Sequence, residues 1–206
     1  GNATRQEMIF PIVVGAVKWA KKQKNIDTSR IYIWGVSNGA TVVANIAAVF
    51  NKKQIKSVFA EAPTNVGMGM PDEPKVPLVL IFGKKDNYGS IKKDGWRWLD
   101  KTLCRKNIYI KSAPKGNTFR CNKFKNKNLL TESHQSWFQK QKKKNKDIQM
   151  WFYEDAAHGI FARKFNLNSF VTNPRTNQKW YTSSGSADYI KEKYKKDLLQ
   201  YILNSR

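Results

Sequence analysis

Cysteine and histidine, which build many catalytic and metal centres, are scarce in this chain. Two of each occur among 206 residues. The cysteines, Cys104 and Cys121, are separated by 16 residues and neither adjoins a histidine. This spacing matches no common metal site, so we predict that the protein holds no metal.

The two cysteines can be interpreted in two ways. A disulfide between Cys104 and Cys121 would close a loop and stabilise the fold by roughly 3 kcal/mol. Such bonds persist in oxidising compartments. Two unpaired thiols are the alternative. We favour the disulfide, and with it a periplasmic or secreted location.

Acidic residues are also few, because 15 Asp and Glu oppose 38 Lys and Arg and give a formal net charge of +23. A strongly positive surface attracts anionic substrates, anionic polymers or membranes. The basic residues concentrate between about 106 and 146, which we predict to be a basic, lid-like insertion. Aromatic residues that could stack on bases lie within it, namely Phe119, Phe124, Trp137 and Phe138. No nucleic-acid motif accompanies them, so we expect no nucleic acid and favour a solvated insertion over a polyanion site.

Long hydrophobic runs are absent. No apolar run approaches the roughly 20 residues that span a bilayer, so we predict no transmembrane segment. The hydrophobic content is 40%, which at this length suffices for one buried core. We therefore predict a single domain over residues 1–206.

Apolar residues alternate between helical spacing and short continuous runs. Helical spacing extends over about residues 6–22 and 39–50, around Trp96 and Leu99, and from 188 onward. Continuous runs typical of buried parallel strands occur at residues 31–34, 57–60, 78–82 and 148–153. This alternation predicts an α/β fold, a mostly parallel sheet covered by helices on both faces, with the basic insertion before the last strand. We expect the first helix to pack against the sheet.

One short motif, Gly35-Val36-Ser37-Asn38-Gly39, lies between an apolar strand and a small-residue helix. This context is what a nucleophile elbow requires, although a plain strand-to-helix turn is the alternative. Glycines on both sides of Ser37 let the strand and helix backbones approach closely. The helix directs the backbone N–H of Asn38 toward an oxygen that becomes negative during acyl transfer. We therefore predict that Ser37 is a nucleophile and that Asn38 donates to an oxyanion hole.

An acid and a histidine follow Ser37 along the chain, each after a predicted strand. They are Asp86 and His158. Glu61, which also ends a strand, is the alternative acid because it could reach the histidine from a neighbouring position. His134 lies in the basic insertion, where we expect a surface role. The order serine, acid, histidine is that of an α/β-hydrolase triad.

On these residues the chain resembles the α/β-hydrolase superfamily, and most closely the dienelactone hydrolase family. The resemblance rests on residues 26–40, 80–86 and 152–161, and it covers most of the chain apart from the insertion. It implies a carboxylic ester or lactone hydrolase that works by a Ser-His-Asp triad through an acyl-enzyme, with no metal or organic cofactor.

The resemblance leaves the substrate open. Dienelactone-cleaving members carry a cysteine nucleophile, whereas this chain has Ser37, which favours a generic esterase acting on a small-molecule or polymeric ester, including an anionic one. A polyester depolymerase or feruloyl-type esterase is the alternative among enzymes. A catalytically weak polyanion-binding module on the same fold is the alternative from another class.

The family pattern also includes strands that precede the serine strand, for which these residues supply no candidate. The strand at 31–34 would then present a bare apolar edge, which proteins rarely leave exposed. We therefore expect a complementary N-terminal segment of roughly 80–100 residues, from typical strand and loop lengths. It would be part of a longer precursor or a separate fragment, and it would bring the second oxyanion donor.

Overall fold

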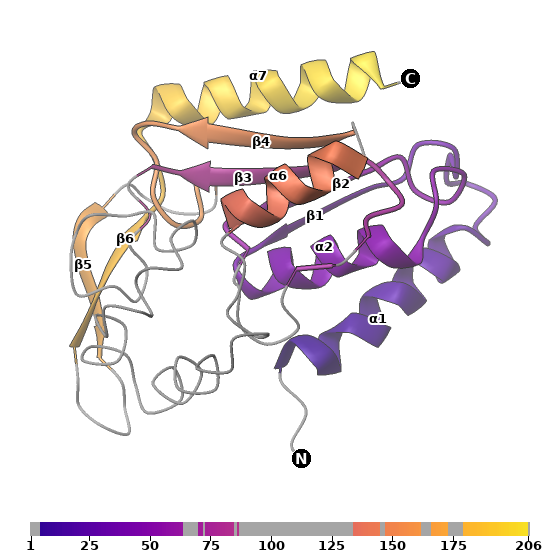
Figure 1. Ribbon diagram of the computed structural model, residues 1–206, viewed down its shortest axis with the longest axis horizontal. Helices are drawn as coiled ribbons and strands as arrows, with labels where there is room; N and C mark the ends of the chain where they lie inside the picture. The colour runs from indigo at the N-terminus through magenta and orange to yellow at the C-terminus, as the bar shows by residue number, and fades with distance from the viewer. Residues whose placement is uncertain are drawn as a thin grey trace. The chain divides into compact units, whose positions relative to one another are not determined.

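The structure is a computed structural model that describes residues 5–63, 70–71, 73–84, 86, 134–144, 147–161, 166–172 and 179–205 (Figure 1). The predicted disulfide between Cys104 and Cys121, the helix around Trp96 and most of the basic insertion lie outside these residues. They remain predictions.

Four helices and six strands are described. In chain order they are α1 (Arg5–Ala20), β1 (Tyr32–Val36), α2 (Asn38–Val49), β2 (Ser57–Glu61), β3 (Leu78–Gly83), α6 (His134–Lys144), β4 (Ile148–Tyr153), β5 (Asn166–Thr172), β6 (Lys179–Ser184) and α7 (Asp188–Asn204). Among the described helices, none is both long and apolar enough to cross a membrane.

The strands β1 to β4 form one sheet in the order β1-β2-β3-β4. β1 pairs with β2, and β2 with β3, in parallel. The N–H of Leu78 donates to the carbonyl of Asp147 and that of Lys84 donates to Tyr153, at the two ends of β3 and β4. Parallel neighbours require crossover connections, as the alternation of strand and helix predicted. The predicted α/β sheet is therefore confirmed.

β1 is the first strand in the sheet order, and β2 is its partner among the described residues. Trp34 of β1 is 46% exposed, although the sequence pattern is that of a central strand. The complementary N-terminal segment that would cover this edge stays a prediction.

The chain divides into two compact units. The first contains Gly1–Ile81, Trp137–Trp151 and Lys196–Arg206, and the second contains Phe82–Ser136 and Phe152–Lys195. The boundary crosses β3, α6, β4 and α7. A single domain over residues 1–206 stays a prediction beside this division.

In the first unit, α2 and the end of α7 cover opposite faces of the strands. Successive strand residues point to opposite faces. Phe59 packs its ring edge to face on Tyr201 of α7, with centroids 5.3 Å apart. Trp34 is in register with Phe59 and therefore shares its face of the sheet. The next residue, Gly35, lies on the opposite face, against α2. α2 buries small and β-branched residues against the strands, namely Ala40, Thr41, Val42, Val43, Ala44, Ile46 and Ala47.

Helix α1 packs against α2, and the two lie side by side (Figure 1). Met8, Ile12 and Trp19, which share one face at helical spacing, are 57%, 68% and 62% exposed. The expectation that this helix packs its apolar residues against a sheet is therefore wrong for Ile12, the one of these three that it included. Val17, on another face, is buried.

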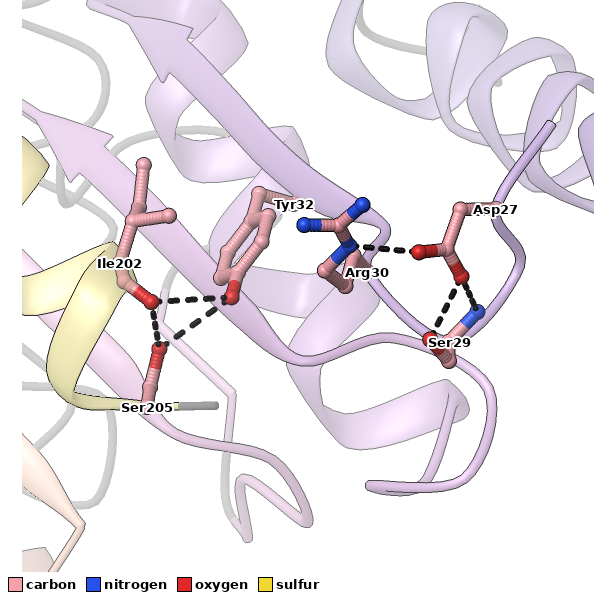
Figure 2. Close-up of polar contacts among 6 residues, drawn as sticks. All are labelled: Asp27, Ser29, Arg30, Tyr32, Ile202 and Ser205. Atoms are coloured by element: carbon pink, nitrogen blue, oxygen red, sulfur yellow. Dashed lines mark hydrogen bonds and ion pairs between the residues drawn. The ribbon is translucent and has the colours of Figure 1, made fainter.

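The turn that leads into β1 is organised by Asp27 (Figure 2). Its carboxylate accepts hydrogen bonds from the backbone N–H of Ser29 at 3.0 Å, from the Ser29 hydroxyl and from Arg30 Nε, the last two at 2.5 Å. The Ser29 hydroxyl and the Arg30 side chain are the main causes that lower the pKa of Asp27 to about 2. At the other end of the same view, the Tyr32 hydroxyl lies 3.4 Å from the carbonyl of Ile202 and 3.2 Å from Ser205 Oγ. The turn before β1 and the first residue of β1 are thus both fixed by polar contacts.

The second unit contains the antiparallel pair β5 and β6, which the sequence analysis did not predict. It follows β4, so the last strand of the parallel sheet is not the last strand of the chain. Helix α7 begins here and buries Ile190 and Tyr194. The centroid of the Tyr194 ring lies 5.4 Å from the ring centroid of Tyr153 and 6.0 Å from that of Phe161.

Helix α6 lies at the end of the predicted insertion. Trp137 is 4% exposed, and its Nε1 donates to the carbonyl of Pro71 at 2.7 Å. A buried, hydrogen-bonded indole cannot stack on a base, so Trp137 does not belong to a nucleic-acid surface. The lysines nearby make local contacts, with Lys142 donating to the carbonyl of Ile148 and Lys144 pairing with Glu73.

The two glycines of the elbow motif differ in the space around them. A Cβ on Gly35 would lie 2.6 Å from the carbonyl oxygen of Gly39 and 3.0 Å from Val43 Cγ2, whereas a Cβ on Gly39 would meet nothing within 4 Å. The close approach of strand and helix backbones is therefore confirmed for Gly35. It does not require glycine at position 39.

We predict different effects of alanine at these two glycines. Gly35→Ala should lower the free energy of unfolding by about 1–3 kcal/mol, because the methyl group overpacks the junction of β1 and α2. Gly39→Ala should leave it unchanged or raise it by up to about 1 kcal/mol, the cost of glycine in a helix. Urea denaturation measures both, and equal effects would contradict the packing described here.

We also predict that Asp27 titrates with a midpoint of about 2, below its ordinary value of 3.8. Because the folded state lowers this pKa, the contribution of Asp27 to stability is present above pH 3.8 and is lost as pH falls through about 2. Carboxyl ¹³C NMR measures the midpoint. Arg30→Gln should raise it, and an unmoved midpoint would show that the Arg30 contact does not form in solution.

Candidate functional site

Ser37 lies between the last residue of β1 and the first residue of α2. Its backbone angles are φ 58° and ψ −120°, a region that residues with a side chain rarely adopt. Two hydrogen bonds maintain this conformation. The N–H of Ser37 donates to the carbonyl of Glu61 at 2.8 Å, and the N–H of Thr41 donates to the carbonyl of Ser37 at 3.2 Å. The predicted strained turn is therefore present at Ser37.

Asn38 is the first residue of α2 and is exposed. The N–H groups of a first helical turn have no acceptor within the helix and lie at its positive end. The Asn38 side chain accepts a hydrogen bond from Gln6 Nε2 at 3.1 Å. Gln6 is 4% exposed on α1. The side chain of the predicted oxyanion residue is thus fixed from a second helix.

Asp86 and His158 meet in the second unit. His158 Nδ1 lies 2.9 Å from Asp86 Oδ2, and the side chains are 5% and 0% exposed. An ionised carboxylate only accepts, so Nδ1 carries the proton and Nε2 is left as the basic nitrogen. This is the tautomer that a general base next to a serine requires.

Asp86 and His158 both follow strands, as predicted. Asp86 comes three residues after the end of β3, and its N–H donates to the carbonyl of Gly83 at 3.1 Å. His158 follows β4 and precedes Gly159, which has a positive φ of 71°. The contact between the two side chains is what the interpretation of Asp86 as the acid needs.

Glu61, the alternative acid, belongs to the first unit. It ends β2, is fully buried and is in register with Val36, so its carbonyl receives the Ser37 N–H. The next residue, Ala62, has a positive φ of 51° and is buried. Strained backbone therefore occurs at the ends of two neighbouring strands, β1 and β2, in this unit.

Sequence reasoning missed Gln6 and Ala62. Gln6 interrupts the apolar face of α1 as a buried amide, but its partner lies 32 residues away in the sequence. Ala62 carries no chemical signal, because its feature is a backbone angle. His134, predicted at the surface, is the first residue of α6. Among the described side chains, no group of three or more His, Cys, Asp and Glu could hold a metal ion.

The comparisons with known proteins give one family and one fold. A family model described as the prolyl oligopeptidase family matches residues 8–196. No curated protein matches the chain. A Klebsiella pneumoniae protein described as a dienelactone hydrolase is similar in structure, with 14% identity and a TM-score of 0.53 over 96% of this chain and 61% of that chain. This likeness and the family match confirm the predicted α/β-hydrolase fold.

An esterase from Pyrococcus furiosus, solved in two crystal forms, also matches. The identities are 17% and 16%, the TM-scores are 0.44 and 0.46, and the matches cover 77% and 76% of this chain and 56% and 55% of the esterase. The chain therefore spans less than two thirds of the length of each of these structures.

We predict that the hydrogen bond between His158 and Asp86 protects the Nδ1 proton from exchange with water. Only two histidines occur, so the imidazole region of a proton NMR spectrum is simple. Asp86→Asn should abolish a slowly exchanging downfield resonance, because the charged acceptor is lost. Glu61→Gln should preserve it. The reverse pattern would make Glu61 the partner of the imidazole.

Proposed function

Because the chain belongs to the prolyl oligopeptidase family, we propose that it is a serine hydrolase that cleaves a carboxylic ester or lactone through an acyl-enzyme. Ser37 is the nucleophile, His158 the general base and Asp86 the acid that orients the imidazole. The observation that carries the proposal is the backbone of Ser37, with φ 58° at the junction of β1 and α2. Such strain costs on the order of 1–3 kcal/mol and is concentrated at functional sites.

The proposed reaction begins with attack of Ser37 Oγ on the carbonyl carbon. His158 Nε2 accepts the hydroxyl proton and then donates it to the leaving alcohol, which breaks the ester bond and leaves an acyl-serine. Water, deprotonated by the same nitrogen, then releases the acid and restores the serine. The chemistry requires Ser37 Oγ and His158 Nε2 to come within hydrogen-bond reach during turnover.

Two further groups stabilise charge in this proposal. Asp86 stabilises the imidazolium that forms when His158 takes the proton. The backbone N–H of Asn38 donates to the developing oxyanion, a contribution worth about 10²–10³ in rate for one such donor. Every step is carried by protein groups and water, so the mechanism uses no metal or organic cofactor.

The family description favours one competing substrate, a peptide bond. The same nucleophile, base and acid can cleave an amide, with the amine as the leaving group. Hydrolysis of a p-nitrophenyl ester without hydrolysis of a proline-containing peptide p-nitroanilide would support the esterase. The opposite preference would support a peptidase. Rates on esters of increasing acyl length and on feruloyl esters would separate a generic esterase from a polyester depolymerase or feruloyl-type esterase.

A polyanion-binding module is the alternative from another class, and the net charge of +23 is its main support. Burial of Trp137 removes one of the aromatic residues that such a surface would use. Salt-sensitive binding to heparin by a protein with no reactive serine would favour the module. A reactive serine would favour the enzyme.

We predict that a fluorophosphonate probe labels Ser37 stoichiometrically. Ser37→Ala should abolish labelling and ester turnover. His158→Ala should slow labelling by several orders of magnitude, because nucleophile and base act as a unit. Peptide mapping by mass spectrometry identifies the labelled residue, and Ser29→Ala, in the turn before β1, is the control that should label normally. Undiminished turnover by Ser37→Ala would overturn the mechanism.

A further inference from the structure

The backbone around His158 is paired with a segment that comes much later in the chain. This support segment, residues 184–189, joins β6 to α7. The N–H of Ala157 donates to the carbonyl of Gly185 at 2.8 Å, and the N–H of Gly185 donates to the carbonyl of His158 at 2.9 Å. Isolated bridges pair Ala156 with Ser186 and His158 with Ser184. Gly185 is thus hydrogen-bonded both to His158 and to the residue before it, Ala157.

Side chains extend this pairing in both directions. Ser186, which is 1% exposed, donates its hydroxyl to the carbonyl of Ile160 at 2.9 Å. The Tyr189 hydroxyl donates to the carboxylate of Asp155, and this bond is the main cause that raises the pKa of Tyr189. The contacts therefore begin before His158 and end after it.

The same turn also lies against the end of β3. A Cβ on Gly83 would lie 2.6 Å from the carbonyl oxygen of Ala157, and it would also collide with the carbonyl of Ala156. The carbonyl of Gly83 in turn accepts a hydrogen bond from the backbone N–H of Asp86 at 3.1 Å. The backbone that carries the acid and the backbone that carries the imidazole are therefore in direct contact.

We propose that Gly185 and Ser186 are positioning residues for His158, and that they hold its imidazole in the orientation in which Nδ1 bonds to Asp86. This inference rests on the proposed function, in which His158 is the base. Gly185 has a positive φ of 68°, a conformation that suits glycine, and its N–H and carbonyl pair with His158 and Ala157. Ser186 fixes the far end of the turn through a buried hydrogen bond. Neither residue needs to contact the substrate.

A consequence of this proposal is that β5 and β6 are coupled to the base. β6 ends at Ser184, the residue bridged to His158, and β5 pairs with β6 along its length. A displacement of this hairpin moves the carbonyl and N–H to which the turn of His158 is bonded. In this proposal a contact made by β5 or β6 can therefore change the orientation of the base.

The test measures the exchange of the His158 Nδ1 proton with water by NMR, in the full chain. His134→Gln assigns the resonance by leaving it in place. We expect Ser186→Ala to speed exchange by about tenfold, the loss expected for one buried hydrogen bond. Ser57→Ala is the matched control, because Ser57 is also buried and its hydroxyl also donates to a backbone carbonyl, that of Pro77, at 3.1 Å in the first unit. It should leave the exchange rate unchanged.

A second variant and a kinetic measurement complete the test. Gly185→Ala should also speed exchange, because alanine is strained at this φ, and if it fails to fold Ser186→Ala decides alone. On an ester substrate, kcat of Ser186→Ala should fall by about tenfold with KM unchanged, since the base and not the binding surface is displaced. Equal exchange rates in Ser186→Ala and the wild type would overturn the inference. Faster exchange with no probe labelling of Ser37 would support it and contradict the proposed function.

Discussion

Direct contact between backbones, with no side chain between them, is the constraint on which both described units depend. In the first unit it occurs where Gly35 of β1 lies against the carbonyl of Gly39 in α2. In the second it occurs where Gly83 lies against the carbonyls of Ala156 and Ala157. A methyl group at either glycine would have to move backbone, which packed interiors resist. Each contact places a candidate functional residue, Ser37 beside the first and His158 beside the second.

The main chain carries much of the geometry around both residues. The N–H of Ser37 donates to the carbonyl of Glu61, and the carbonyl of Ser37 accepts from the N–H of Thr41. At His158, the carbonyl accepts from the N–H of Gly185, and the N–H of the preceding Ala157 donates to the carbonyl of Gly185. Side-chain bonds such as those of Gln6 and Ser186 are added to this frame. Such an arrangement preorganises reactive groups without relying on flexible side chains.

The sequence predicted the elements whose residues are continuously apolar and missed those whose fold depends on distant contacts. β4 was predicted at the residues where it occurs, and β1, β2 and β3 to within two residues at each end, because buried parallel strands give an unbroken apolar signal. The pair of Asp86 and His158 was predicted from strand ends. In contrast, Asn166–Thr172 is mostly polar and gives no clear alternation, so β5 was missed. The α6 segment, rich in lysine, is anchored by Trp137, whose partner Pro71 is 66 residues away.

Few acidic residues are available to offset the lysines, and several of the described ones form ion pairs with a lysine that lies beside them in the fold. Asp147 pairs with Lys52, Glu154 with Lys84 and Glu73 with Lys144. All three pairs are partly or largely exposed, so each adds little to stability. The positive field that remains acts over distances of about a Debye length, near 10 Å at 0.1 M salt. It therefore influences the approach of charged molecules more than it influences the fold.

The dependence on main-chain contacts has an evolutionary consequence. A carbonyl or an N–H is supplied by almost any residue, so a frame built from them fixes the identity of very few positions, such as the two glycines that allow the close approach. Surface positions outside this frame therefore face few constraints from the main-chain contacts, and lysine is compatible with them. A frame of this kind is compatible with a shared hydrolase fold at a sequence identity of only 14% to a similar structure.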